Sequence, residues 1–249
     1  MDRFEIYNLA ERYMELINPI SEEQLIRMGE IMELTSGSHV IDFGAGFAGM
    51  LRLWARDFGI SGLGVEFRKD ACLRARENLL KHGYQDQIHI VEGDASTYNF
   101  ERSAFDVACC IGASFIWKGF RNTLKAMKEA IPKDGHILIA EPYWVHDSVP
   151  EEFKEREKDA VHTEFELLTI AREEGFDLKF ISRATPEGWD HYESGNWRGL
   201  IQWLSENEDH PERDEVVNYL RKIQDDYLDY ARKYVGLVIL VLVPSMDLN

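Results

Sequence analysis

Short, nearly continuous apolar runs alternate along this chain with longer segments in which apolar residues recur every three or four positions. The runs are typical of buried strands, and the spaced segments are typical of amphipathic helices. The pattern predicts strands at residues 40–43, 62–67, 88–91, 105–111, 136–140, 177–182 and 235–243. It predicts helices at residues 4–17, 21–34, 50–55, 70–82, 119–130, 163–174, 196–204 and 212–234. This alternation indicates an α/β protein.

Five strand–helix units in one chain predict a doubly wound, Rossmann-like sheet of seven strands, in which the last two form an antiparallel edge pair. We expect a single domain, residues 1–249, whose core sheet comprises residues 37–184 and 235–244. Residues 1–36 are N-terminal helices that either pack against the sheet edge or form a lid over a ligand. Residues 185–234 are a helical insertion on the substrate side. Within these parts, residues 148–160 are predicted to start a solvated helix, and residues 186–193 to form an aromatic, charged loop.

The segment after the first predicted strand has the strongest functional signal. Gly44, Gly46 and Gly49 follow the strand, and helical spacing begins at Met50. A strand, a glycine turn and a helix start form the nucleotide-binding crevice of open α/β sheets. The spacing fits the dinucleotide fingerprint, but Asp42 stands two residues before the first glycine. A carboxylate there suits a ligand with an ammonium and a sulfonium better than a pyrophosphate.

Two further acids stand at the ends of the next predicted strands. Glu66 follows the second strand, about 20 residues beyond the glycine turn, where an acid accepts bonds from ribose hydroxyls. Asp94, in the turn 92–95, follows the third strand. Because parallel strands end at the same edge of a sheet, we expect Asp42, Glu66 and Asp94 to meet at one crevice.

These motifs resemble those of the class I S-adenosylmethionine-dependent methyltransferases. The family's first motif is acidic-x-Gly-x-Gly-x-Gly, and here Ala48 occupies the slot of the last glycine. The turn Gly93-Asp94-Ala95 and the Pro-x-x-Gly at 132–135 also match. The resemblance implies S-adenosylmethionine as cofactor and a fold with a reversed last strand. It implies cofactor contacts from Asp42, Gly44, Ala45, Gly46, Gly49, Glu66, Phe67, Asp94, Ala95, Ile111 and Gly112.

The acceptor site is predicted from aromatic residues at later strand ends and in the insertion. These residues are Trp117, Tyr143, Trp144, Trp189 and Tyr192. They indicate a pocket for an apolar, aromatic or amine substrate, unless they only attach the insertion to the body. Glu141 and His191 are the base candidates, although methyl transfer needs a base only when the nucleophile carries a proton. Asp106 lies at the wrong strand end for a carboxylate cluster, so we expect no metal.

Composition narrows the partners further. The formal net charge of −17 argues against nucleic acid and anionic membranes. An apolar run of about 18 residues is absent, which predicts no membrane span. The N-terminus lacks the features of a signal peptide, and three cysteines form no evident disulfide framework, so we expect a cytoplasmic protein. We expect a small-molecule acceptor and a monomer or homodimer.

Three alternatives to a small-molecule methyltransferase stay open from the sequence. One is an NAD-type oxidoreductase on a related fold, which Asp42 and Asp94 disfavour. A second is a non-catalytic protein that binds S-adenosylmethionine. A third is an enzyme that modifies proteins, because acidic surfaces attract basic partners.

Overall fold

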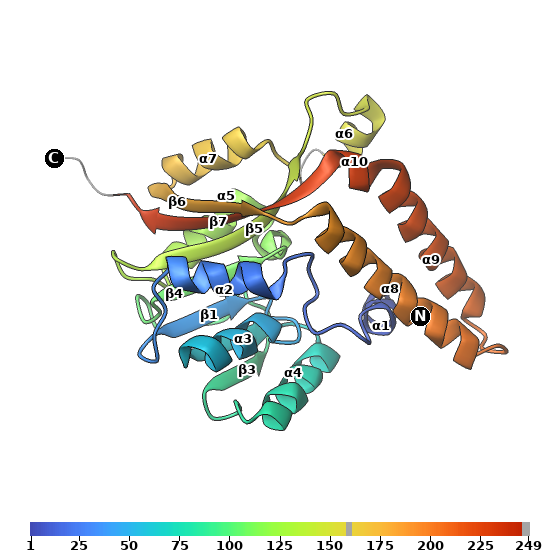
Figure 1. Ribbon diagram of the computed structural model, residues 1–249, viewed down its shortest axis with the longest axis horizontal. Helices are drawn as coiled ribbons and strands as arrows, with labels where there is room; N and C mark the ends of the chain where they lie inside the picture. Colours follow the sequence, from blue (N-terminus) through green and yellow to red (C-terminus); the bar gives the residue numbers. More distant parts are fainter. Residues whose placement is uncertain (158–160, 246–249) are drawn as a thin grey trace.

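The computed structural model describes residues 1–157 and 161–245. Its seven strands form one sheet in the order β3-β2-β1-β4-β5-β7-β6 (Figure 1). The strands are β1 His39–Phe43, β2 Ser61–Glu66, β3 Ile88–Glu92, β4 Val107–Ile111, β5 His136–Trp144, β6 Phe176–Arg183 and β7 Val235–Pro244. Strand β7 runs antiparallel to both β5 and β6. The sheet therefore has the predicted class, with a reversed last strand.

Helices cover both faces of the sheet (Figure 1). They are α1 Arg3–Ala10, α2 Glu22–Ile31, α3 Gly49–Phe58, α4 Lys69–His82, α5 Phe120–Lys128, α6 Glu151–Glu157, α7 Glu164–Glu173, α8 Pro186–Glu206, α9 Arg213–Asp226 and α10 Arg232–Tyr234. A 3-10 turn, η1, spans Ser114–Trp117, and a π turn, η2, spans Tyr227–Ala231. Among the described residues, no helix is long and apolar enough to cross a membrane.

Successive residues of the central strands belong to two different cores. Val40 and Cys109 pack with Trp54 in one cluster, under α2, α3 and α4. Ile41 and Cys110 pack in the other, under α5 and α7. Successive side chains of a strand point to opposite faces, so strands buried on both faces read as continuous apolar runs. This explains why the strands were predictable from the sequence.

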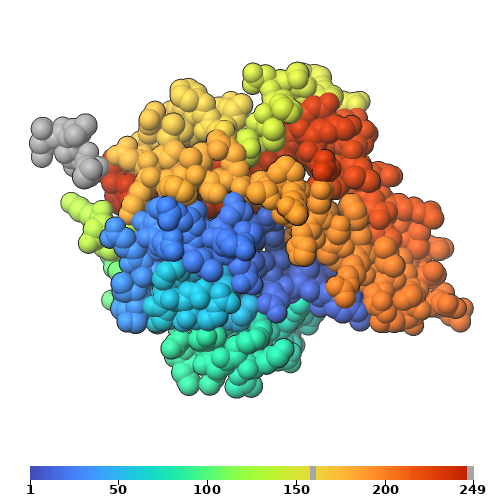
Figure 2. Space-filling view, viewed as in Figure 1, coloured from blue at the N-terminus to red at the C-terminus, as the bar shows by residue number. Residues whose placement is uncertain are grey.

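A third core joins the N-terminus to the insertion. Ile6 and Ala10 of α1 are buried against Leu200 and Trp203 of α8 and against Leu220 of α9. Figure 2 shows the dark blue N-terminal residues in contact with the orange α8 region. Helix α1 is therefore held by the insertion, at one end of the sheet.

Two predicted elements were placed wrongly. The first helix ends at Ala10, not at residue 17, and the chain from 11 to 19 runs without a regular helix. Residues 186–193 are not a loop, because α8 runs unbroken from Pro186 to Glu206. Thr185 caps this helix by accepting a bond from the Gly188 amide, with Pro186 at the first position, a start signal that sequence reading overlooked. In the segment 148–160, a helix is present as α6, while residues 158–160 lie outside the described part.

Candidate functional site

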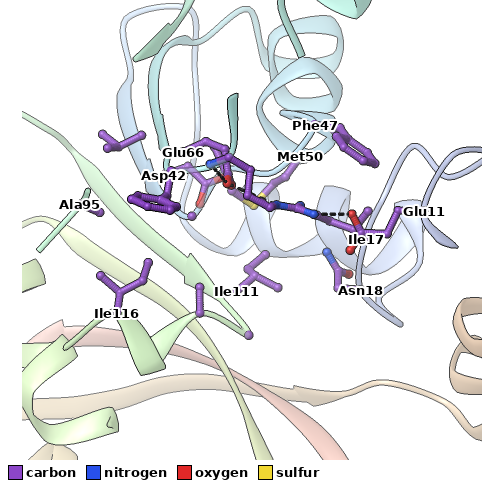
Figure 3. A pocket seen from close by; sticks show the side chains of 18 of the residues that line it. Glu11, Ile17, Asn18, Asp42, Phe47, Met50, Glu66, Ala95, Ile111 and Ile116 are labelled. Atoms are coloured by element: carbon purple, nitrogen blue, oxygen red, sulfur yellow. Dashed lines mark hydrogen bonds and ion pairs between the residues drawn. The ribbon is translucent and has the colours of Figure 1, made fainter. Parts of the chain in front are cut away.

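A cavity of about 460 Å³ opens beyond the carboxyl ends of β1, β2, β3 and β4. One part of its wall comes from the strand tips and their turns, and the rest from the N-terminal segment and α8. Figure 3 shows Ala95 and Ile116 toward one end of the cavity and Glu11 and Asn18 toward the other, with Asp42 and Glu66 between. Open α/β sheets bind their ligands at this edge.

The β1 turn brings backbone and a buried carboxyl group to the cavity. Gly44 and Gly46 have φ of +78° and +54°, a conformation that glycine adopts without strain. Asp42 is only 5% exposed. Burial, and next the nearby Glu66 carboxylate, raise the pKa of Asp42 to about 7. The β1 turn thus places the Asp42 carboxyl at the cavity, where its ionised form is unfavourable unless a cationic ligand lies beside it.

Glu66, at the tip of β2, is fixed by two backbone donors. The Gly46 amide donates to its Oε2 at 2.8 Å, and the Arg68 amide donates to its Oε1 at 2.8 Å. The Arg68 guanidinium lies 3.5 Å from the same carboxylate and donates to Glu11 at 2.7 Å. The dashed lines in Figure 3 mark such contacts beside Glu66 and Glu11. Each carboxylate oxygen can accept further bonds, so the ribose position stays accessible.

Asp94, at the tip of β3, faces the other end of the cavity. The Ser96 hydroxyl and amide donate to its Oδ1 at 2.7 and 2.8 Å. These bonds hold the pKa of the Asp94 carboxyl below its usual value. Ala95, Phe67, Ile111 and Gly112 line the cavity nearby. Asp94 is therefore ionised at neutral pH and free to accept from a ligand through its second oxygen.

The residues predicted to contact the cofactor lie together. Ten of them line the cavity, namely Asp42, Gly44, Ala45, Gly49, Glu66, Phe67, Asp94, Ala95, Ile111 and Gly112. Gly46 is not among the lining residues, but its backbone N–H donates a hydrogen bond to Glu66, which is. The structure thus gathers residues from four strand tips that are far apart in the sequence.

The N-terminal segment forms a roof that sequence reading did not assign residue by residue. Glu11, Glu15, Leu16, Ile17 and Asn18 all line the cavity. A side chain added at Gly46 would lie 2.5 Å from the Ile17 Cδ1, and one added at Gly49 would lie 2.5 Å from the Glu15 carbonyl oxygen. The lack of side chains at Gly46 and Gly49 therefore leaves room for the roof as well as for a ligand. In the sequence, the available signal for this roof was the pair of acids Glu11 and Glu15, which stand four residues apart before Asn18-Pro19.

Arginines from α3 and α4 tie this roof down. Arg52 donates to the Glu15 carboxylate at 2.6 Å. Arg74 donates to the backbone oxygens of Glu11 and Met14, and its guanidinium covers the Phe47 ring at 3.9 Å. Together with the Arg68–Glu11 pair, these contacts fix residues 11–15 across the glycine turn.

The two base candidates do not line the cavity. Glu141 on β5 is 2% exposed and accepts from the Ser114 hydroxyl at 2.9 Å. Its other oxygen, Oε1, is buried and has no hydrogen-bond partner in the described part of the chain. Burial raises the pKa of Glu141 to about 8, despite the Ser114 bond. His191 is exposed on α8.

The predicted aromatic residues are scattered. Tyr192 of α8 lines the cavity. Trp189 packs edge-on against Tyr192, with ring centroids 6.2 Å apart. Trp117 packs edge-on against Phe43, Tyr143 is buried in the core, and Trp144 packs against Phe153 of α6. The structure thus brings only Tyr192 of the five to the cavity wall.

This sheet order, with its reversed last strand and a glycine turn between acidic strand tips, defines a class I S-adenosylmethionine-dependent methyltransferase. Residues 40–135 match a family model described as a methyltransferase domain. A crystal structure of an S-adenosylmethionine-dependent methyltransferase from Geobacter sulfurreducens, in complex with S-adenosylhomocysteine, is 31% identical; the match covers 96% of this chain and 98% of that one, with a TM-score of 0.89. This chain belongs to that family.

Two further relatives are similar over nearly the whole length. A methyltransferase from Thiobacillus denitrificans, also in complex with S-adenosylhomocysteine, is 29% identical over 98% of this chain and 100% of that one, with a TM-score of 0.89. The Escherichia coli protein YjhP is 29% identical over 98% of this chain and 99% of its own. Family membership decides between the two cofactors in favour of S-adenosylmethionine over a nicotinamide.

Proposed function

We propose that this protein transfers the methyl group of S-adenosylmethionine to a small-molecule acceptor by direct displacement. The single observation that supports this most is the convergence of Asp42, Glu66 and Asp94 on one cavity together with the glycine turn. Acidic groups at three strand tips suit a cofactor that carries a sulfonium and an ammonium and has no phosphate.

The residues around the cavity have separate roles in this proposal. Asp94 and the Ala95 amide hold the adenine, between the apolar side chains of Phe67 and Ile111. Glu66 accepts the ribose hydroxyls, and its bonds to the Gly46 and Arg68 amides keep its carboxylate in place. Asp42 and the turn with Gly44, Ala45, Gly46 and Gly49 hold the methionine part, and Gly112 admits close approach at β4.

S-adenosylmethionine supplies an electrophilic methyl group, so the protein contributes mainly alignment and exclusion of water. Residues 11–18 exclude water because they lie over the glycine turn and are tied to α3 and α4. In the same proposal, residues 1–36 act as the lid, residues 37–184 and 235–244 form the core, and residues 185–234 contribute the substrate side.

Glu141 acts in this proposal as an anchor of η1 rather than as a base. Its bond to Ser114 holds the turn that carries Phe115 and Ile116, which line the cavity. His191 lies outside the cavity lining and has no assigned step. The aromatic residues other than Tyr192 brace the insertion and the core. A cytoplasmic location and a monomeric or homodimeric state complete the proposal.

Calorimetric titration with S-adenosylmethionine, S-adenosylhomocysteine and NAD tests the cofactor part. We expect binding of the first two and none of NAD. A transfer assay with tritiated methyl groups over amines, thiols, phenols and carboxylates then tests catalysis. Tight cofactor binding with no transfer to any acceptor would favour a non-catalytic binding protein instead.

A further inference from the structure

On the proposed function, the acceptor lies at the end of the cavity lined by the chain after α1 and by α8, away from the residues assigned to the adenine. Glu11 and Asn18 lie at the end of the cavity away from Ala95 and Ile116 (Figure 3). Tyr7 and Tyr192 line the same cavity, and Tyr192 is close enough to Glu11 for that carboxylate to raise its pKa. We call Tyr7, Glu11 and Tyr192 the acceptor wall.

The charges that line the cavity are strongly unbalanced. Among the described residues, five acids line it, namely Glu11, Glu15, Asp42, Glu66 and Asp94. The only cationic side chain among the lining residues of the described ranges is Arg68, which already contacts both Glu11 and Glu66. Arg52 pairs with Glu15, and Arg74 donates to the backbone oxygens of Glu11 and Met14. Each arginine named here is therefore already engaged by the protein, and none of the three is left unpaired for an anionic acceptor.

Binding of S-adenosylmethionine would not neutralise the excess of acidic side chains that line the cavity. Its sulfonium and ammonium outnumber its one carboxylate, so it adds a single positive charge against several carboxylates. A phosphate or carboxylate on the acceptor would have to enter an acidic, partly buried site without a partner, which is costly. A positively charged acceptor gains from the same field.

The surroundings of Tyr192 add to the preference for a cation. The neighbouring Glu193 does not line the cavity, but burial raises its pKa to about 7. Tyr192 is neutral at neutral pH, as tyrosines ordinarily are, and burial, Glu11 and Glu193 raise its pKa further, so its ring can offer a neutral face to a cation. Tyr219 of α9 supports the wall, with its ring centroid 6.3 Å from that of Tyr7. Arg3 lies over the Tyr7 ring, 5.2 Å from its centroid, and donates to the Tyr7 hydroxyl, so the cation–π contact with an acceptor is assigned to Tyr192.

Building on the proposed function, we propose that the acceptor is a small amine, which binds as an ammonium at the acceptor wall and is methylated on nitrogen. The bound ammonium first gives one proton to the Glu11 carboxylate. The nitrogen lone pair then forms a bond to the methyl carbon while the carbon–sulfur bond breaks and its electron pair goes to sulfur. The sulfonium charge thus moves to the methylated nitrogen, and Glu11 later loses its proton to water.

Burial raises the pKa of Glu11 although Arg68 opposes the shift, which suits a group that takes up a proton transiently. The carboxylates near the wall also stabilise the charge that develops on nitrogen, because it remains positive after transfer.

A matched pair of probes tests the proposal in the complex with S-adenosylhomocysteine. N,N-dimethylethanolamine is an ammonium at neutral pH, and 3-methylbutan-1-ol is its uncharged isostere. We expect calorimetry to show the ammonium binding about tenfold more tightly. Isovalerate, of similar shape but anionic, should not bind measurably. Equal or tighter binding of the alcohol, or binding of neither probe to a complex that holds S-adenosylhomocysteine, would overturn the proposal.

Variants separate a charge effect from a general loss of the wall. Glu11→Gln should reduce the ammonium-to-alcohol ratio to about twofold, and Tyr192→Leu should reduce it while Tyr192→Phe preserves it. Glu30→Gln, which breaks an exposed pair with Arg27 on α2, is the control and should leave the ratio unchanged. An unaltered ratio in Glu11→Gln would count against the assignment.

The proposed function and this inference would be contradicted by different results. If neither S-adenosylmethionine nor S-adenosylhomocysteine binds, the cofactor site itself is wrong. If both bind and the enzyme methylates phenols or carboxylates but no amines, the methyltransferase proposal stands and the acceptor class is wrong.

Discussion

The guanidinium of Arg68 lies 2.7 Å from the carboxylate of Glu11, and both side chains are only 11% exposed. The same guanidinium lies 3.5 Å from Glu66. One arginine, at the turn between β2 and α4, thus connects the end of α1 to the acid expected to hold the ribose. The position of the roof and the geometry of the ribose site are therefore linked.

Replacing Arg68 by methionine should loosen the roof and weaken cofactor binding. Two mostly buried carboxylates lose their shared partner, which should lower the free energy of unfolding by about 2–4 kcal/mol. We expect the affinity for S-adenosylhomocysteine to fall about tenfold, measured by calorimetry alongside denaturant unfolding. Arg27→Met, which removes an exposed pair on α2, is the matched control and should change neither quantity much. Full affinity in Arg68→Met would disprove the link.

Asp42→Asn should raise stability while reducing function. The folded-state pKa of Asp42 is about 7, above an unfolded value near 4, so the folded protein holds this proton more tightly. Its contribution to the free energy of unfolding therefore falls as pH rises from about 4 to 7. Above pH 7 the amide variant should be more stable than the wild type by about 2 kcal/mol or more, and near pH 4 the two should match.

The same variant should bind S-adenosylmethionine at least about tenfold more weakly, because the ionised carboxylate no longer faces the cation. Urea unfolding at low and high pH and calorimetry measure the two effects. If the Asp42→Asn variant bound the cofactor as tightly as the wild type does, the site would lose its electrostatic basis.

Gly46→Ala should impair the protein more than a substitution that strains the backbone alone. The new Cβ would lie 2.5 Å from the Ile17 side chain at a φ of +54°. We expect a loss of about 2 kcal/mol in stability and weaker cofactor binding. Gly83→Ala has a similar φ of +79° with no atom within 4 Å of the new Cβ, and should cost about 1 kcal/mol without affecting binding. If both variants behave alike, the roof does not press on the glycine turn.

Glu141→Gln distinguishes an anchor from a base. Because the pKa of Glu141 is about 8, its side chain is mostly neutral at neutral pH, and an amide keeps its shape and its bond to Ser114. We expect kcat within about threefold of the wild type, whereas removal of a base costs about a hundredfold or more. Steady-state kinetics on any accepted substrate measures this, with Ser114→Ala expected to lower activity by displacing η1.

Glu141→Gln should also change how the free energy of unfolding depends on pH. The folded-state pKa of Glu141 lies above its unfolded value, so the wild type loses stability as pH rises from about 4.5 to 8. Glu141→Gln should lose less over that interval in urea unfolding. A large loss of kcat with unchanged pH dependence of stability would assign Glu141 to the chemistry.

The sheet and the meeting of the acidic strand tips at one cavity were predictable because the signals are local. The run from Val40 to Phe43 is buried on both faces and so is apolar except at Asp42, which with Gly44 marks its end. Since parallel strands end at one edge, Glu66 and Asp94 needed only correct strand assignments to be placed together.

The roof was not predictable in the same way, whereas Tyr192 of the acceptor wall was expected on the substrate side and does line the cavity. Glu11 and Ile17 lie in a segment whose apolar spacing suggested a helix, but ion pairs with residues more than 35 positions away hold part of it in another form. Tyr143 ends a strand as expected, yet its side chain faces the core, because sheet pleating and not proximity to the strand end decides its direction.

The two walls of the cavity are encoded in separate stretches of the gene. The strand tips proposed to hold the cofactor fall within residues 40–135, whereas Tyr7, Glu11 and Tyr192 lie outside that stretch. On the proposed function, changes in the flanking stretches would alter the choice of acceptor while leaving the strand tips unchanged. Residues 1–20 and 185–234 share a core, so a graft that re-engineers the acceptor side would move both together and keep Arg52, Arg68 and Arg74, which hold the roof.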